Sequence, residues 1–269
     1  ALAAILPLWV LVAGSVTGEQ ELILEGYSLM PKTFSLDAYK YLFYKASEIF
    51  RAYGITVFIT VVGTAASLFI TPLLAYPLSR KDFKARFFTM LFNGGIVPSY
   101  IMWTRIFHLK NTITALILPG LLMNGFNVIL MKNYFAQNIP AELIEAAKMD
   151  GAGEFKIFFK MILPLSLPIM ATVGLFVGIG YWNDWTNGLY YVTDAKLYSL
   201  QNLLNRILQD VQFLNSSTMT NAGVAATTQM PSVSIRMAIS VVGILPIMVL
   251  YPFFQKYFVK GIAVGAVKG

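Results

Sequence analysis

The sequence predicts an all-α integral membrane protein with six transmembrane helices, and three observations support this fold class. First, 57% of the 269 residues are hydrophobic and only 12% are charged, whereas a soluble protein has about 25% charged residues. Second, the apolar residues gather in six long runs, and a helix of about 20 such residues crosses a bilayer. Third, basic residues concentrate in the connections between alternate runs, which is typical of membrane proteins with a fixed orientation.

The six predicted spans are residues 2–16, 55–78, 87–106, 113–131, 162–181 and 237–258. We expect residues 1–269 to form a single transmembrane domain. The first run has neither a basic lead-in nor a small-residue cleavage site, so we interpret it as a span, with a signal peptide as the alternative. Prolines lie inside several runs, which membrane helices tolerate because neighbouring groups satisfy the freed backbone.

The basic residues predict which connections face the cytoplasm. They concentrate after the second, fourth and sixth spans: Arg80, Lys81, Lys84 and Arg86; Lys132, Lys148, Lys156 and Lys160; Lys256, Lys260 and Lys268. Short connections with an excess of Lys and Arg stay on the cytoplasmic side. The sequence therefore predicts both termini inside. The net charge of +7 is then explained by membrane orientation rather than by nucleic-acid binding.

Two long segments are predicted outside, at residues 17–51 and 183–236. Within the second, apolar residues recur at helical spacing from Leu200 to Val211, and polar residues fill the opposite face. We expect this amphipathic helix either on the bilayer surface or against a partner subunit. Residues 215–231 are small and polar, which predicts an exposed and mobile loop.

A helix–turn–helix is predicted in the cytoplasmic connection at residues 138–164. Pro140 can begin a helix, strong helix formers follow it, and Gly151 can end the helix by adopting a positive φ. A second short helix over 154–161 then leads into the fifth span. The amphipathic surface of this connection suits docking into a groove on another protein.

The same connection carries a motif with fixed spacing, which reads EAA at 145–147, G at 151, M at 161 and LP at 163–164. This pattern resembles the EAA loop of binding-protein-dependent ABC importer permeases, with Met161 where the family usually has Ile or Val. The resemblance implies a type I ABC importer permease fold with a coupling loop that docks on an ATPase subunit. The coupling residues that it implies are Glu145, Ala146, Ala147, Asp150, Gly151, Leu163 and Pro164.

Other segments are similar to the MalG-like subgroup of maltose-type carbohydrate importers. They are PKTFSLDAY at 31–39, AYPLSR at 75–80, FNGGIVPSY at 92–100, WNDW at 182–185 and YPFFQKYFVKGIAVGAVKG at 251–269. The resemblance implies a permease subunit for oligosaccharides, including acidic ones of the alginate type. It also implies a bacterial cytoplasmic (inner) membrane as the location.

The expected partners also follow from the resemblance: a second permease subunit in a heterodimer, two ATPase subunits, an extracellular or periplasmic solute-binding protein, the sugar and membrane lipid. The chain has no GxxxxGK[ST] loop to cradle phosphate, so ATP and Mg are expected on the ATPase subunits and no cofactor on this chain. With no Cys and with His108 as the single histidine, neither a metal site nor an enzyme is predicted. A stand-alone secondary transporter or channel is the alternative, but the internal repeats and midplane charges typical of that class are not evident.

Polar residues in or beside the spans are candidates for the substrate path: Asn93, Asn127, Trp182 and Asp184. Asparagines in spans can instead bond across helices, which we expect for Asn124. The Trp and Asp candidates can instead belong to an interfacial belt.

Two outer regions are candidates for contact with ligands or partners. Arg105, His108 and Lys110 either attract an acidic sugar or are ordinary boundary charges. In the maltose-type relatives that this chain resembles, the long outer loop reaches the docked binding protein. The candidate contacts in that loop are Asn215, Ser216, Asn221 and Gly223.

Overall fold

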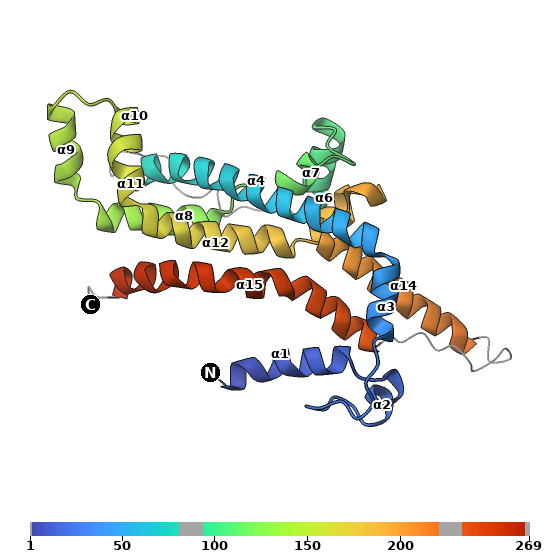
Figure 1. Cartoon of the computed structure of the whole chain (residues 1–269). Helices are drawn as coiled ribbons and strands as arrows, with labels where there is room; N and C mark the ends of the chain where they lie inside the picture. The colour runs from blue at the N-terminus through green and yellow to red at the C-terminus, as the bar shows by residue number, and fades with distance from the viewer. Residues whose placement is uncertain (1, 81–93, 221–232, 267–269) are drawn as a thin grey trace. The chain divides into compact units, whose positions relative to one another are not determined.

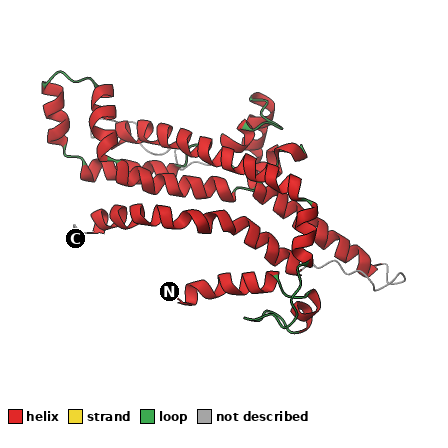
Figure 2. Ribbon diagram, viewed as in Figure 1, coloured by secondary structure: helices red, strands yellow, loops and turns green. Residues whose placement is uncertain are grey.

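The structure, a computed structural model, describes residues 2–80, 94–220 and 233–266, and these residues are mostly helical (Figure 1 and Figure 2). Within these ranges, an antiparallel bridge between Thr17 and Phe34 is the only strand-like pairing. The chain divides into two compact units, which are described separately. Unit 1 contains Ala1–Ile55 and Tyr198–Tyr251, and unit 2 contains Thr56–Leu197 and Pro252–Gly269.

Unit 1 is built from α1 (Leu2–Ser15), α2 (Glu19–Leu24), α3 (Asp37–Tyr44), the start of α4 (Ala46–Ser79), α14 (Leu200–Thr220) and the first part of α15 (Val233–Ala266). The carboxylate of Glu19 accepts hydrogen bonds from the backbone N–H groups of Val233 (2.8 Å) and Ser234 (2.9 Å). The first N–H groups of a helix have no partner within the helix, and a negative charge is favourable there. Glu19 therefore ties the beginning of α15 to the segment after α1.

Glu21 orders the segment between α2 and α3. Its carboxylate accepts hydrogen bonds from the hydroxyl (2.6 Å) and backbone N–H (2.7 Å) of Thr33 and from the backbone N–H of Lys32 (3.0 Å). The bond from the Thr33 hydroxyl, followed by that from the Lys32 backbone, lowers the pKa of Glu21. Donors of this kind favour the ionised form of a carboxylate.

The residues of the predicted amphipathic helix lie in α14, but their environment differs from the prediction. The apolar stripe is buried within unit 1, as shown by Leu200 (0% exposed) and Ile207 (1% exposed). Leu204 lies next to Gly243 of α15. The stripe therefore packs against the chain itself, rather than lying on a bilayer surface or against a partner, because α15 supplies an apolar surface.

Two further features of α14 depart from expectation. The helix continues to Thr220, so the prediction of a loop from residue 215 is wrong for residues 215–220. Asn202, which the spacing places on the polar face, is buried with 0% exposure. On the same side of the helix, the guanidinium of Arg206 lies over the ring of Tyr198 at 4.3 Å, a cation–π contact.

The described residues contain one helix that is by itself long and apolar enough to cross a membrane, Ala46–Ser79. The pair Glu154–Leu165 and Leu167–Asn183, bent by 78°, is a second candidate, and Ile5–Ser15 and Val233–Val249 are shorter apolar helices. The predicted span at 87–106 is described only from residue 94. The number of six spans therefore stays a prediction.

Unit 2 contains the rest of α4, and the segments that follow it are α6 (Ile96–Ile101), the π-helix η1 (Met102–Ile106), α7 (Thr114–Ile117), α8 (Gly125–Asn138), α9 (Ala141–Met149), α10 (Glu154–Ile157), the π-helix η2 (Phe158–Ile162), α11 (Leu163–Leu165), α12 (Leu167–Asn183), α13 (Thr186–Tyr191) and the 3₁₀-helix η3 (Ala195–Leu197). In Figure 1, α4 and α12 run side by side. A Cβ atom at Gly63 of α4 would lie 2.3 Å from the ring of Tyr181. On α12, Gly174 faces Leu68 and Gly178 faces Thr64. Small residues let membrane helices approach closely, and these three glycines lie where α4 and α12 face each other.

The apolar run at 113–131 is not one continuous helix, unlike the predicted span. It is broken between α7 and α8, where Pro119 has no N–H to donate and Gly120 adopts a φ of +71°. Asn124 then begins α8, with its side-chain oxygen accepting from the N–H of Phe126 (2.8 Å). Asn124 is thus a local helix cap, whereas we expected it to bond across helices.

Two side chains from α12 and α13 satisfy the backbone at this break. The hydroxyl of Tyr181 donates to the carbonyl of Ile117 (2.8 Å), and the amide of Asn187 donates to the carbonyl of Pro119 (3.0 Å). An unsatisfied carbonyl in apolar surroundings is costly. These two partners therefore stabilise the broken helix.

Asn111 joins two segments that the sequence places on the outer side. Its side-chain oxygen accepts hydrogen bonds from the backbone N–H groups of Thr193 (2.6 Å) and Asp194 (3.2 Å). The backbone N–H of Asn111 donates to the carbonyl of Tyr191 (3.0 Å). Asn111 has a φ of +57°, a conformation that Asn adopts more readily than most residues. The connection after η1 is therefore fastened to the end of α13.

We predict that Gly63→Ala destabilises the protein by about 1–3 kcal/mol, because the new methyl group must displace the buried ring of Tyr181. The matched control is Gly54→Ala in the same helix, where a Cβ would meet nothing within 4 Å. That substitution should be neutral or stabilising by up to about 1 kcal/mol, since Ala favours a helix over Gly. Apparent melting temperatures in detergent test this, and equal melting temperatures for the two variants would contradict it.

We also predict that the wild-type chain loses thermal stability on acidification more steeply than Glu21→Gln. The pKa of Glu21 is lowered in the folded state. Its contribution to stability is therefore complete above the ordinary pKa of glutamate and disappears as the pH falls through the lowered value. Melting temperatures measured from neutral to acidic pH test this, with Glu48→Gln at the exposed start of α4 as the control. Parallel curves for wild type and Glu21→Gln would argue against it.

Candidate functional site

The connection at 138–164 forms two short helices at one end of unit 2. In Figure 1, α9 and α10 stand next to each other and project from the end formed by α8, α11 and α12. The chain leaves α8, passes Pro140 in an extended conformation and enters α9. After a turn it follows α10, η2 and α11, and the bend of 78° then leads into α12. The two helices thus lie outside the α4–α12 contact.

Gly151 ends α9 in the left-handed conformation expected from the sequence, with a φ of +74°. The N–H of Ala152 donates to the carbonyl of Ala147 (2.9 Å), and the N–H of Gly151 donates to the carbonyl of Lys148 (3.0 Å). This pair of bonds is a Schellman motif, which closes a helix and satisfies its last carbonyls. A residue with a Cβ would be strained at this φ, so the turn requires glycine.

The predicted coupling residues divide between two faces of the loop. Glu145, Ala146, Asp150, Gly151 and Pro164 are exposed. In contrast, Ala147 is buried (8% exposed) together with Ile144, and Leu163 is half-buried. Ala147 therefore attaches α9 to the rest of the unit, whereas Glu145 and Ala146 are available to a partner.

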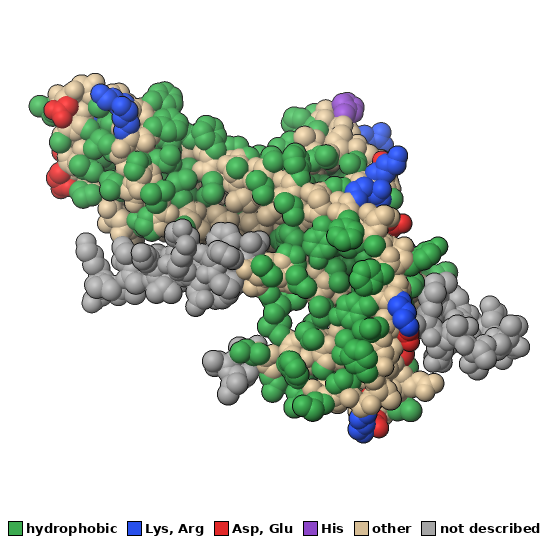
Figure 3. Space-filling view, in the orientation of Figure 1, with side chains coloured by type: hydrophobic (Ala, Val, Ile, Leu, Met, Phe, Trp, Pro, Cys, Tyr) green, Lys and Arg blue, Asp and Glu red, His purple; other side chains and the backbone are tan. Residues whose placement is uncertain are grey.

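Large apolar side chains are exposed on the same loop, and the sequence analysis did not identify them. Met149 at the end of α9 is 89% exposed, and Phe155 in α10 is 78% exposed. In Figure 3, hydrophobic side chains lie beside charged ones at this end of the molecule. Exposed apolar groups that gather beside a polar rim mark a contact surface. The sequence did offer a signal for them, because both residues lie in the short predicted helix–turn–helix at 138–164.

A chain of polar contacts joins the loop to the end of α4. The ammonium of Lys148 lies 2.6 Å from one oxygen of Glu154, and the hydroxyl of Tyr76 donates to the other oxygen (2.9 Å). Arg80 donates to the same hydroxyl (3.4 Å). A cavity of about 400 Å³ lies beside these groups, with Phe158 among its walls.

Two candidates for the substrate path, Trp182 and Asp184, lie together at the end of α12, and Asn127 lies in α8. Asn127 is buried in α8 (6% exposed) and Trp182 is buried at the end of α12 (6% exposed), while Asn93 lies outside the described residues. Asp184 is buried (8% exposed) and accepts hydrogen bonds from the backbone N–H groups of Thr186 (3.1 Å) and Asn187 (3.3 Å). Its carboxylate thus binds the first N–H groups of α13, a local side-chain to backbone contact that the sequence analysis did not predict.

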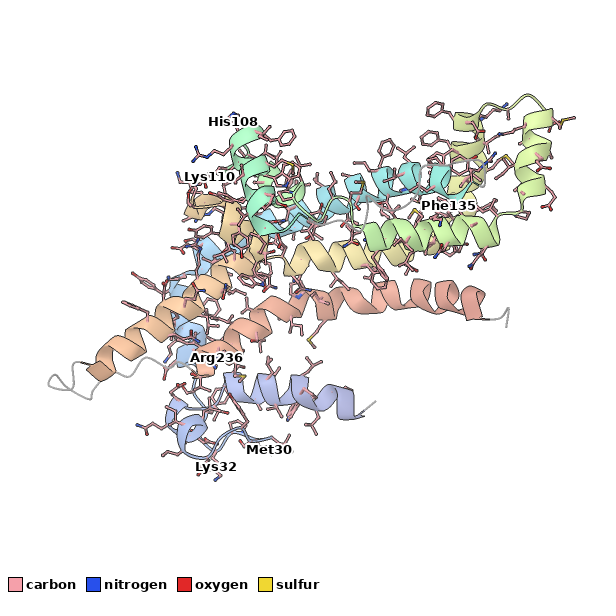
Figure 4. All side chains as sticks on the ribbon, turned by 180° about the vertical axis from the view of Figure 1, so that it is seen from behind. Met30, Lys32, His108, Lys110, Phe135 and Arg236 are labelled. Carbon is pink, nitrogen blue, oxygen red and sulfur yellow. The ribbon has the colours of Figure 1, made fainter. Side chains whose placement is uncertain are left out.

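The candidate residues for contact with an acidic sugar or the binding protein lie in two regions. Figure 4 shows His108 and Lys110 close together at the turn after η1, and both are exposed, as is Arg105. Asn215 and Ser216 belong to the helical backbone of α14. Asn221 and Gly223 lie outside the described residues.

Comparison with known proteins identifies the class. Residues 46–264 match the family described as "Binding-protein-dependent transport system inner membrane component", and the chain belongs to this family. It is therefore the membrane component of a transport system rather than an enzyme. The coupling-loop motif pointed to the same family.

Individual relatives resemble the chain over nearly its whole length. Protein LplC of Bacillus subtilis (strain 168) is 43% identical over 98% of this chain and 90% of its own. The polygalacturonan/rhamnogalacturonan transport system permease protein YtcP of the same organism is 40% identical over 100% and 94%. A solved bacterial ABC transporter involved in the import of the acidic polysaccharide alginate has a chain 29% identical to this one. The two superpose with a TM-score of 0.75 over 96% of this chain and 91% of that chain. The protein thus has the type I ABC importer permease fold.

We predict that Gly151→Ala disturbs the end of α9, because a φ of +74° costs a residue with a Cβ about 1–2 kcal/mol. The matched control is Gly153→Ala two residues later, where φ is −69° and a Cβ would meet nothing within 4 Å. Trypsin should cut at Lys148 faster in Gly151→Ala than in the control, and transport should fall. Equal cleavage rates and equal transport in the two variants would show that the turn does not depend on glycine.

Proposed function

We propose that the chain is the permease subunit of an ATP-driven, binding-protein-dependent importer of oligosaccharides, including acidic ones of the alginate type. Similarity over the full length to permeases named for sugars is the observation that carries the substrate class. YtcP is named for polygalacturonan and rhamnogalacturonan, the solved neighbour for alginate, and AraQ of Halalkalibacterium halodurans, 32% identical, for arabinooligosaccharides. The first two names include acidic polysaccharides, which supports an acidic substrate.

In this proposal, the loop at 138–164 is the cytoplasmic coupling loop. Glu145 and Ala146 are exposed on α9, and Met149 and Phe155 are exposed apolar groups on the same loop. A polar and apolar surface on two short helices suits a groove on an ATPase subunit. Two such subunits would hold ATP and Mg, a second permease would complete the path, and a binding protein would deliver the sugar.

The proposed topology has six spans with both termini inside. The end of unit 2 that carries α9 and α10 also carries Arg80 at the end of α4, which agrees with the positive-inside rule. Asn111 joins the connection after η1 to Thr193. The sequence predicts both of these segments outside, so this contact also agrees with the proposed topology. A stand-alone transporter is not favoured, because the family is binding-protein-dependent.

The proposal is tested by co-purifying the chain with its second permease, ATPase and binding-protein partners and reconstituting the complex in liposomes. ATP hydrolysis should increase when the binding protein is loaded with fragments of alginate or polygalacturonan. Neutral oligosaccharides of the same length show whether the acidic groups matter. If neither acidic nor neutral oligosaccharides stimulate hydrolysis, the assignment as a sugar importer is wrong.

We predict that Glu145→Lys lowers transport and stimulated ATP hydrolysis by about tenfold or more, since reversing a charge at a partly buried interface costs several kcal/mol. The permease should still insert and fold, because the side chain of Glu145 is exposed. Asp210→Lys, the same charge reversal at an exposed position of α14, is the control and should retain activity. Wild-type transport by Glu145→Lys at equal membrane levels would remove this residue from the interface.

A further inference from the structure

We propose that Glu154 and Tyr76 are positioning residues that fix the angle between the coupling loop and the end of α4, so that movement of the loop is transmitted to this helix. The inference rests on the proposed coupling function of residues 138–164. It adds two residues that are not among the fixed positions of the EAA motif: Glu154 within the loop, and Tyr76, which comes 78 positions earlier in the chain. Neither residue needs to touch a partner subunit to have this role.

Glu154 connects three elements through its two oxygens. One oxygen lies 2.6 Å from the ammonium of Lys148 on α9, and the other accepts from the hydroxyl of Tyr76 on α4 (2.9 Å). Glu154 itself begins α10. One carboxylate therefore holds both short helices of the loop and the end of α4 in a single arrangement.

Apolar contact supports this arrangement but leaves space. The ring of Phe158 lies 5.5 Å from that of Tyr76, and Phe158 is buried (3% exposed). The same groups line a cavity of about 400 Å³. The space lies beside the contact between Tyr76 and Phe158, so the hydrogen bonds of Glu154 add to side-chain packing as a constraint on the angle between α10 and α4.

The contact between Glu154 and Lys148 is exposed, whereas Tyr76 is buried (8% exposed). The side chains of Lys148 and Glu154 are 43% and 55% exposed. Exposed ion pairs contribute little to stability, since water screens them. Substitutions at this carboxylate should therefore leave the folded complex intact while changing how the loop is held.

The experiment measures sugar imported per ATP hydrolysed by the complete complex in liposomes with loaded binding protein. Tyr76→Phe keeps the ring and removes the hydroxyl, and Glu154→Ala removes the carboxylate. Each should lower the import ratio by about fivefold, which is the lower end of typical coupling between sites. Yield of the complex and basal ATP hydrolysis should stay within about twofold of wild type, because the Lys148–Glu154 pair is exposed and adds little stability, and because Tyr76→Phe keeps the buried ring.

Three comparisons separate positioning from a general structural effect. Tyr134→Phe removes another hydroxyl bond in unit 2, to the carbonyl of Leu165, and should leave the ratio unchanged. Glu154→Gln keeps an acceptor for Tyr76 and should retain more of the ratio than Glu154→Ala. The double variant Tyr76→Phe/Glu154→Ala should be no worse than the poorer single variant, because both remove the same contact.

The outcomes distinguish this inference from the proposed function. A wild-type complex without stimulated hydrolysis overturns the proposed function. A coupled wild-type complex with unchanged ratios in Tyr76→Phe and Glu154→Ala overturns the positioning role alone. The positioning role is also overturned if the import ratio of the double variant falls by the product of the two single effects. A loss of complex yield that accounts for the lower transport overturns it as well.

Discussion

The close approach of α4 and α12 at Gly63 constrains the position of Tyr181 and, through it, the break before α8. Because Gly63 has no side chain, the ring of Tyr181 fits against α4. Tyr181 is completely buried there. From there its hydroxyl reaches the carbonyl of Ile117 at the break before α8. One aromatic side chain thus satisfies two needs of a membrane protein: close packing without a hydrophobic driving force and a partner for every backbone group.

Glu154 has a comparable position at the cytoplasmic end of the proposed topology, but its contacts are of another kind. Tyr181 is enclosed by protein, so its contacts are fixed by packing. Glu154 is half-exposed and binds through charge and hydrogen bonds beside a cavity. The proposed function requires both kinds of contact: a tightly packed one between helices, and a weaker one at the loop through which movement would enter.

Local signals in the sequence were enough to predict part of this structure. Gly151 marks the end of α9 through its backbone conformation alone. Pro140 marks the start, but it lies in an extended conformation one residue before the helix, whereas the sequence predicted it as the first helical residue. The apolar period of α14 predicted a helix but not what would cover its stripe, since a period does not distinguish α15 from a bilayer. The contact of Tyr76 with Glu154 was not predictable, because a single sequence carries no information that pairs residues so far apart. The break at Pro119 was visible, yet we interpreted its run as one span because its partners, Tyr181 and Asn187, come from distant helices.

The residues of the predicted coupling motif divide between two faces of one short helix. Ala147 faces inward with Ile144 and attaches α9 to the unit, so its small side chain permits close packing against the protein itself. Glu145 and Ala146 face outward beside Met149 and Phe155, which no described part of this chain covers. Apolar side chains this exposed are unfavourable in water, and burial against a partner would remove that cost. A helix held on one side by its own chain and completed on the other by a partner can transmit movement, because neither contact alone determines its position.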